Sequence, residues 1–305
     1  MKKIDAHLHV AKVLAGYCRR GELRSAGNGM AVWGNGETFR LIPREFGDTD
    51  ATAERALEVM RENDVERAVL MQGSMYGFQN QYHRELLARY PDRFCPTCTV
   101  DPFAADHLET LEYLLDECGM RAVKFEVSSG GGLMGCHEPF SLCSERMMEI
   151  FRRIARRKLV VALDVGDWNM PSHQPVALAK IADAFPEMRL VVCHLLAPAR
   201  DRERELELSL RLLDKPNVWF DLAALPKIVC LPDSYPFEAA QRVIRRAADL
   251  VGAGRLMWGS DAPFAAVRDP YPQLADYLET SALFSQEELS AMYYDNAAYV
   301  YFSES

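Results

Sequence analysis

The stretch Ile4-Asp5-Ala6-His7-Leu8-His9-Val10 has the composition of a buried strand that carries two histidines. Side chains alternate between the two faces of a strand, so His7 and His9 are predicted to share one face and Ala6 and Leu8 the other. Two neighbouring imidazoles on an apolar strand are typical of a divalent metal site, although two histidines can also share a face by chance. The rest of the chain must therefore supply further ligands.

Seven more apolar segments follow at regular intervals. The eight predicted strands begin near residues 4, 67, 94, 121, 159, 190, 218 and 256, and each except the first is followed at short range by a helical pattern. This alternation predicts a parallel sheet of the α/β class. Eight repeats favour a closed (β/α)8 TIM barrel of the metal-dependent hydrolase type. An open doubly wound sheet is the alternative, but no G-x-G-x-x-G motif follows any strand.

No segment interrupts the alternation in a way that suggests a second domain, so residues 1–305 are predicted to form one barrel domain. Residues 11–48, rich in glycine and arginine, are predicted to be a long, irregular loop insertion. Ser285 and Glu288 have the spacing of a capping box and predict the start of the last helix.

Composition limits the partners and the compartment. The chain has 305 residues, 49% of them hydrophobic, which is enough for a sizeable core, and a net charge of −9. The negative charge argues against nucleic acid and against anionic membranes as partners, but a local cationic pocket can still hold a small carboxylate substrate. No apolar segment reaches transmembrane length and no signal peptide is recognised. With eight scattered cysteines, including Cys95 and Cys98, which we interpret as structural, we expect reduced thiols and a cytoplasmic protein.

Polar residues are concentrated where the predicted strands end. In a TIM barrel, these ends meet at the face that carries the active site. A cluster of histidines and carboxylates at this mouth predicts a metal site with a position open to water. The strand-end residues are His7, His9, Lys124, Glu126, Asp164, His194, Asp221 and Asp261.

Three of these segments carry a resemblance to a known family. Ile4–His9, Val191–Leu195 and Gly259–Pro263 resemble the best-marked motifs of the amidohydrolase-related family. This branch of the amidohydrolase superfamily contains aminocarboxymuconate-semialdehyde decarboxylase and pyrone-dicarboxylate lactonase. Leu289 and Asp295-Asn296-Ala297 resemble its closing helix.

The resemblance implies a barrel with one divalent metal ion, for which zinc is the expected identity. It implies that His7, His9 and Asp261 occupy ligand positions. His194 corresponds to the sixth-strand histidine that assists the metal-activated water or polarises the substrate, so Asp261 and His194 are the predicted catalytic residues. A homodimer is also expected from the resemblance.

The fifth predicted strand departs from the family pattern. Many relatives have a ligating histidine where this chain has Asp164. A carboxylate can bind zinc, but it adds negative charge and makes a bound water less acidic. Three interpretations therefore stay open: Asp164 is a ligand, the metal is held more weakly, or the site works without a metal. The departure counts against a decarboxylase more than against a hydrolase.

Several other polar or aromatic residues are candidates for substrate binding, each with a simpler alternative. A strand-end lysine can bind a substrate carboxylate, reach solvent or, less often, be carboxylated between two metals. Loop histidines are commonly solvated, and a large aromatic residue is more often part of the core. His83 and His107 are expected on helix surfaces, and Asp221 is expected to have a structural role. The candidates for substrate binding are Lys124, Glu126, His137, His173, Trp168 and Arg200.

The favoured function is hydrolysis of a small carboxylated lactone, ester or amide through a metal-activated water. In this hypothesis Asp261 accepts a proton from the water and returns it to the leaving group, while His194 stabilises the oxyanion. The alternative is a non-oxidative decarboxylase, a lyase, that acts on a small unsaturated or aromatic acid. A barrel that has lost its chemistry is the third hypothesis, and the joint presence of His7, His9, His194 and Asp261 speaks against it.

Overall fold

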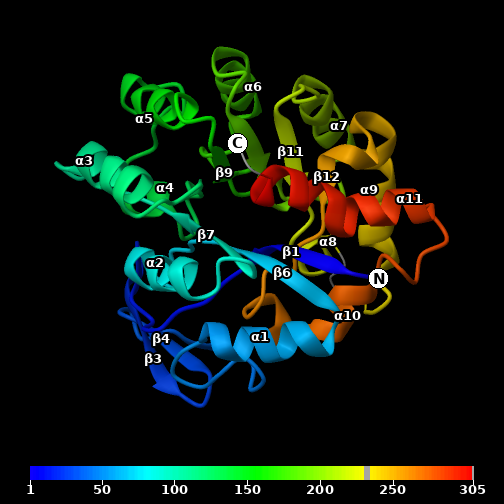
Figure 1. The fold of residues 1–305 in the computed structure, drawn as a ribbon, viewed down its shortest axis with the longest axis horizontal. Helices are drawn as coiled ribbons and strands as arrows, with labels where there is room; N and C mark the ends of the chain where they lie inside the picture. Colours follow the sequence, from blue (N-terminus) through cyan, green and yellow to red (C-terminus); the bar gives the residue numbers. More distant parts are fainter. Residues whose placement is uncertain (230–233, 304–305) are drawn as a thin grey trace.

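The structure, a computed structural model, describes residues 1–229 and 234–303 and contains an eight-stranded parallel barrel (Figure 1). All eight predicted strands are confirmed, and neighbours in the chain are neighbours in the sheet. In sheet order they are β1 (Lys3–Leu8), β6 (Val65–Leu70), β7 (Phe94–Cys98), β8 (Ala122–Glu126), β9 (Val160–Asp164), β10 (Arg189–Val192), β11 (Val218–Asp221) and β12 (Leu256–Met257).

The barrel closes where the chain segment at β12 meets β1. Backbone N–H groups of Ala6 and Asp261 donate to the carbonyls of Trp258 (3.0 Å) and His7 (2.8 Å). The two segments approach so closely that a Cβ at Gly259 would lie 2.8 Å from the Cβ of His7. Glycine is therefore required here by close packing, and the closure brings the first and last strand ends together.

Helices cover the outside of the barrel because each presents one apolar face to the strands. On α5, the predicted apolar residues Met147, Ile150, Phe151 and Ile154 are all buried. The principal helices are α1 (Ala53–Glu62), α2 (Asn80–Arg89), α3 (His107–Glu112), α5 (Glu145–Ala155), α6 (Pro175–Ala184), α7 (Glu203–Leu212) and α9 (Glu238–Val251). Shorter helices lie in the connections: α4 (Leu133–Cys136), α8 (Leu225–Val229), α10 (Tyr271–Asp276) and α11 (Gln286–Ser290).

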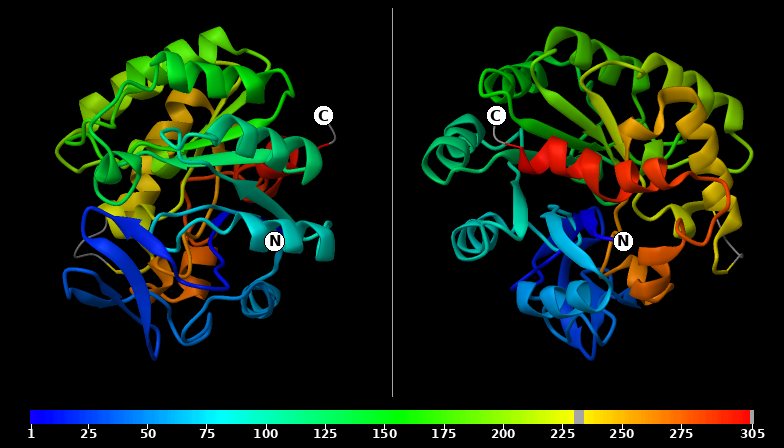
Figure 2. Two further views of the ribbon diagram at one scale, coloured as in Figure 1. Left: turned by 90° about the vertical axis from the view of Figure 1, so that its left-hand side faces the viewer. Right: turned by 45° about the vertical axis from the view of Figure 1, so that its right-hand side comes forward.

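The C-terminal helical segment seals the end of the barrel where the strands begin. Ser285 and Glu288 form the predicted capping box at the start of α11. Farther along, Val300 and Tyr301 pack into the apolar cluster inside the barrel, and the Val300 carbonyl accepts a hydrogen bond from Arg189 at the start of β10. This segment is the red helix that crosses the barrel in Figures 1 and 2. Only the opposite end, where the strands finish, remains for a binding site.

The prediction of an irregular insertion at residues 11–48 is wrong. This segment contains a four-stranded antiparallel sheet of β2 (Gly16–Cys18), β3 (Gly21–Gly27), β4 (Met30–Trp33) and β5 (Thr38–Arg40), drawn in blue in Figure 2. Asn28 and Gly29, both with positive φ, connect β3 to β4. The Asn-Gly pair is a strong hairpin signal that the composition of the segment obscured.

The prediction that Ala6 and Leu8 share a face is also wrong. Ala6 packs inside the barrel, whereas Leu8 packs in the outer cluster, because the pairing of β1 with β6 is irregular between Asp5 and Leu8. The buried carboxylate of Asp5 accepts from the backbone N–H groups of His7 (3.1 Å) and Ser260 (2.9 Å). Burial raises the pKa of Asp5 to about 6. The irregularity leaves His7 and His9 together at the open end.

Seven of the eight cysteines lie in the described part of the chain, and these are free thiols. Burial raises the pKa values of Cys95 and Cys98 to about 12, so neither is poised as a thiolate. Within the described ranges, no helix is both long enough and apolar enough to span a membrane.

His83 was expected on a helix surface, but α2 buries it completely against the barrel. Its Nδ1 lies 2.7 Å from the Thr97 carbonyl oxygen, which is only an acceptor, so Nδ1 carries the proton of a neutral imidazole. Burial lowers the pKa of His83 to about 4, from an ordinary value of 6.5. The helix period predicted the helix but not which of its polar residues faces the barrel.

The buried His83 predicts a pH-dependent stability. Between pH 6.5 and 4 the unfolded chain binds a proton that folded His83 does not, so the free energy of unfolding falls as the pH falls. From pH 7 to pH 5 the native protein should lose about 2 kcal/mol more than a His83→Asn variant. Urea unfolding of both proteins at both pH values measures this difference, and parallel losses would contradict it.

Candidate active site

Three histidines at the open end of the barrel are oriented in the same way. Each has its Nδ1 at 3.0 Å from an oxygen that can only accept: a carboxylate oxygen of Asp221 for His7, and the carbonyls of Met71 and Ala223 for His9 and His194. Each Nδ1 therefore carries a proton and donates the hydrogen bond, which leaves each Nε2 available for other partners. The His7 ring lies 5.1 Å from that of His9 and 4.7 Å from that of His194.

His7, His9 and Asp261 form a group that fits a divalent cation. One donor atom from each lies within 4.8 Å of the others. The buried Nε2 of His7 has no hydrogen-bond partner, and the Nε2 of His9 lies 3.2 Å from Oδ1 of Asp261. Since the other nitrogen of neutral His9 is a donor, two acceptors face each other here. Such a pair needs a proton or a cation between the atoms, and nitrogen with carboxylate oxygen is a donor set that zinc and manganese accept.

Burial and the neighbouring charges shift the pKa values of His7 and His194 in opposite directions. Burial lowers the pKa of His7 to about 4, so this ring is neutral at pH 7 and keeps a lone pair on Nε2. Burial has the same tendency at His194, but the carboxylates of Asp164, Asp221 and Asp261 outweigh it and raise the pKa of His194 to about 10. His7 is thus suited to bind a metal ion, and His194 to donate a hydrogen bond.

The carboxylates of the cluster remain ionised. Burial would raise the pKa of Asp261, but the neighbouring His9 and the positive charge of His194 hold it below its usual range. Burial would also raise the pKa of Asp221, but His7 and His194 lower it to about 2.

Strained backbone positions two of these residues. Asp261 has φ of +60°, and four consecutive residues from His194 to Ala197 have φ between +47° and +64°. Non-glycine residues in this region cost about 1–3 kcal/mol each and tend to occur at functional sites. Oδ1 of Asp221 anchors the second segment because it accepts from the backbone N–H of His194 at 2.9 Å. Asp221, for which a structural role was expected, therefore orients both His7 and His194.

Asp164 lies beside His194. Its Oδ2 is 3.5 Å from Nε2 of His194. Burial would raise the pKa of Asp164, but His194 and Lys124 hold it below its ordinary range. Two groups of described residues have donor atoms within 4.8 Å of one another, namely His7, His9 and Asp261, and His7, His194 and Asp221, and Asp164 belongs to neither. This geometry favours a role for Asp164 as the partner of His194 over a role as a ligand.

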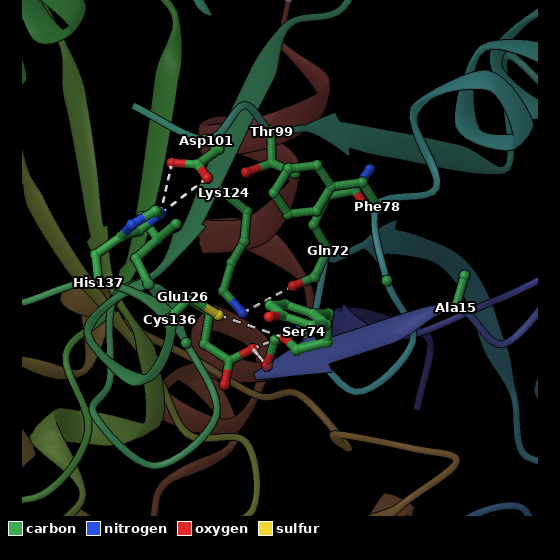
Figure 3. Close-up of a pocket in the computed structure, with 15 residues that line it drawn as sticks. Ala15, Gln72, Ser74, Phe78, Thr99, Asp101, Lys124, Glu126, Cys136 and His137 are labelled. Atoms are coloured by element: carbon green, nitrogen blue, oxygen red, sulfur yellow. Dashed lines mark hydrogen bonds and ion pairs between the residues drawn. The ribbon is translucent and has the colours of Figure 1, made fainter. Parts of the chain in front are cut away.

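Two cavities meet at this cluster. The smaller one, about 230 Å³, is lined by the three histidines and Asp261 and is named here the metal-side cavity. The other, the outer cavity of about 580 Å³, is shown in Figure 3. The two cavities share the lining residues Gly73, Lys124 and Glu126.

Lys124 and Glu126 therefore lie at the junction of the cavities. Nζ of buried Lys124 donates to the Gln72 carbonyl at 3.0 Å, and Glu126 accepts from the backbone N–H (2.7 Å) and the hydroxyl (2.8 Å) of Ser74 (Figure 3). Burial would lower the pKa of Lys124, but Cys193 and the nearby carboxylates raise it, so the ammonium stays charged. Both residues line the cavities at the strand ends, and substrate binding by either one stays a prediction.

The other predicted substrate contacts divide into two groups. His137 lines the outer cavity, where its Nε2 donates to Asp101 at 2.9 Å. Trp168 and His173 line a separate small hollow, in which the Trp168 ring packs 3.7 Å from the guanidinium of Arg202. Arg200 donates to the Val229 carbonyl beside another surface hollow. The prediction of substrate contact is therefore not supported for Trp168, His173 and Arg200, because they line hollows that share no residue with the two cavities at the cluster.

Some lining residues were not predicted. Tyr76 stacks on His9 with a ring separation of 4.7 Å, and Lys227 of α8 lies 3.4 Å from the centre of the Phe264 ring in the metal-side cavity. Asp101 and Phe78 line the outer cavity. These residues lie in the connections beyond the strand ends, where neither period nor motif marks them.

Comparisons with known proteins agree with this architecture. Residues 4–302 match the model of a family described as Amidohydrolase. Comparison with curated proteins gives no significant match. Solved structures of the same fold include a probable 2-pyrone-4,6-dicarboxylic acid hydrolase from Acinetobacter baumannii with citric acid bound. It has 19% identity and a TM-score of 0.70, with 99% of this chain and 100% of that protein covered.

Two further similar structures contain metals. An amidohydrolase from Burkholderia multivorans with bound zinc has 16% identity, 99% coverage of both chains and a TM-score of 0.68. A dihydroxybenzoic acid decarboxylase from Polaromonas sp. JS666, with manganese and 2-nitroresorcinol, has 12% identity, covers 82% of this chain and 86% of its own, and has a TM-score of 0.62. At these identities the likeness shows the fold.

The orientation of His7 by Asp221 predicts a loss of metal affinity when the carboxylate is neutralised. An Asp221→Asn variant should bind zinc about 10- to 100-fold more weakly, because an amide no longer fixes the ring of His7 by a charge-assisted hydrogen bond. Competition with a chromogenic chelator measures this affinity. Asp249→Asn, which changes an acid on the outer surface of α9, is the matched control, and equal affinities of both variants would contradict the assignment.

Proposed function

Because the chain belongs to the amidohydrolase family, whose members are enzymes, we propose that it hydrolyses a small carboxylated lactone, ester or amide with the help of one divalent metal ion. The observation that carries this proposal is the convergence of the Nε2 atoms of His7 and His9 on Asp261 in a cavity next to a buried lysine. Zinc is the proposed metal.

The residues His7, His9 and Asp261 would hold the ion. A divalent metal there supplies a Lewis acid that lowers the pKa of a water molecule and polarises a carbonyl group. Asp221 and the Met71 carbonyl keep the two rings in the tautomer that presents Nε2. The protein therefore needs no rearrangement of these side chains to bind the ion.

Asp261 and His194 would carry out the proton transfer and the charge stabilisation. Asp261 is ionised, so its carboxylate can accept the proton of the attacking water and return it to the leaving oxygen or nitrogen. His194, whose Nδ1 is bound to the Ala223 carbonyl, presents its second N–H to the oxyanion that forms on the substrate. The positive φ at both residues is consistent with positions selected for function.

Lys124 is the proposed anchor for the substrate carboxylate. Its ammonium group has three N–H bonds, of which one is donated to the Gln72 carbonyl. It lies at the wall shared by the two cavities, so a bound carboxylate would stand next to the reacting group.

Hydrolysis is preferred over decarboxylation because of the fifth strand. Asp164 occupies the position at which decarboxylases of the amidohydrolase-related family have a histidine. In this structure, Asp164 pairs with His194. A carboxylate at this position also disfavours the negative charge that builds up on carbon when carbon dioxide leaves.

Metal removal and substitution of Asp261 test the chemistry. Dialysis against a chelator should abolish hydrolysis, and addition of zinc or manganese should restore it. An Asp261→Asn variant should lose about 10²- to 10⁴-fold in kcat because it lacks the proton acceptor. Metal content is measured in parallel, and full turnover of a metal-free preparation would contradict the proposal.

The products decide the reaction class. Incubation with a set of small lactones and esters, and with a set of hydroxylated aromatic acids, should release acid from the first set and no carbon dioxide from the second. Acid release is followed with a pH indicator and carbon dioxide with a coupled assay. Evolution of carbon dioxide without hydrolysis would replace the hydrolase proposal by the decarboxylase alternative.

A further inference from the structure

The outer cavity differs in chemistry from the metal-side cavity. The metal-side cavity, at about 230 Å³, is smaller than most ligand pockets, whereas the adjoining outer cavity has about 580 Å³. A substrate whose reacting group lies next to Asp261 and extends past Lys124 must enter the outer cavity. The residues of that cavity then decide which substrates fit.

The walls of the outer cavity favour a flat, apolar group. Tyr17, Phe78 and Leu133 contribute large apolar surfaces, and several of the other lining residues are small. Phe78 and Tyr17 are 52% and 64% exposed, so much of each ring is in contact with water. A ring that packs against them would cover apolar surface that is otherwise in water.

The charges of the outer cavity oppose a second anion. Of the described residues that line it, Lys124 is the only lysine or arginine, and it lies at the junction with the metal-side cavity. The acidic residues that line it are Glu126, at the same junction, and Asp101. Glu126 is held by Ser74, whereas the Asp101 oxygens accept from His137 and from the backbone N–H of Phe103. A carboxylate oxygen accepts more than one hydrogen bond, so Asp101 can still receive a donor from a ligand.

We propose that the outer cavity binds an uncharged aromatic ring of the substrate, and that Asp101, positioned by His137, selects rings with a hydrogen-bond donor and rejects a second carboxylate. This inference rests on the proposed function for the position of the reacting group. It specifies the substrate class as a monocarboxylate with a hydroxyl- or amino-substituted ring, in contrast to a dicarboxylate. Figure 3 shows Asp101 joined to His137 across the cavity from Ser74.

Two short series of ring acids test this selection. The probes are benzoate, 4-hydroxybenzoate and 1,4-benzenedicarboxylate, together with the longer cinnamate, 4-hydroxycinnamate and 4-carboxycinnamate. Binding to the full-length protein is measured by titration calorimetry. In at least one series, the hydroxylated acid should bind about tenfold more tightly than the parent acid, and the dicarboxylate about tenfold more weakly.

Substitutions assign the effect to the cavity. Asp101→Asn should reduce both differences to about threefold or less, and Phe78→Ala should weaken all ring acids by about tenfold. Asp106→Asn, which changes an exposed acid five residues away, is the matched control and should leave every affinity unchanged.

Several results would overturn the inference: a dicarboxylate that binds more tightly than its parent acid in both series, no binding by either parent acid, or an Asp101→Asn variant that behaves like the native protein. Hydrolysis of a small aliphatic lactone, which fits in the metal-side cavity alone, is measured on the same preparation. Hydrolysis without the binding pattern refutes only this inference, whereas the binding pattern without hydrolysis of any substrate refutes the proposed function.

Discussion

The closure of the barrel between its first and last strands is the constraint on which the site depends. Residues about 250 positions apart in the chain are joined there by backbone hydrogen bonds, one of which links Asp261 to His7. Gly259 permits the close approach, and the buried carboxylate of Asp5 accepts N–H groups from both segments. A change in this contact would move the histidine pair relative to Asp261, so the stability of the barrel and the geometry of the site are coupled.

Around this contact, the protein holds its ionisable groups by fixed acceptors. Asp221 and the carbonyls of Met71 and Ala223 each accept a hydrogen bond from one imidazole Nδ1–H, so the Nε2 atoms of His7 and His9 converge without a search among tautomers. The cost is paid in strained backbone at Asp261 and along His194–Ala197. Such preorganisation lowers the reorganisation required when charge develops during a reaction.

The two cavities of the site are lined by different parts of the fold. The barrel strands and the residues that directly follow them supply the reactive groups of the metal-side cavity, whereas loops supply most of the outer cavity, including Phe78 and Asp101. This division suits a family in which one scaffold supports different substrates, because loops can change without moving the strands. Lys124 and Glu126 lie at the boundary and line both cavities.

The sequence by itself determined the eight strands, the capping box at Ser285 and the cluster of polar residues at the strand ends, because alternating apolar segments and strand-end polarity are local patterns. It also placed His7, His9 and Asp261 at one barrel mouth, since parallel strands of a barrel end at one face, and the resemblance to a known family singled out these three as ligands. Local patterns could not show that β1 is irregular at Ala6, that α2 buries His83, or that Trp168 and Arg200 line hollows away from the site. Those outcomes depend on contacts between distant segments, in which burial and hydrogen bonding outweigh the preferences of each residue, and only the tertiary structure decided them.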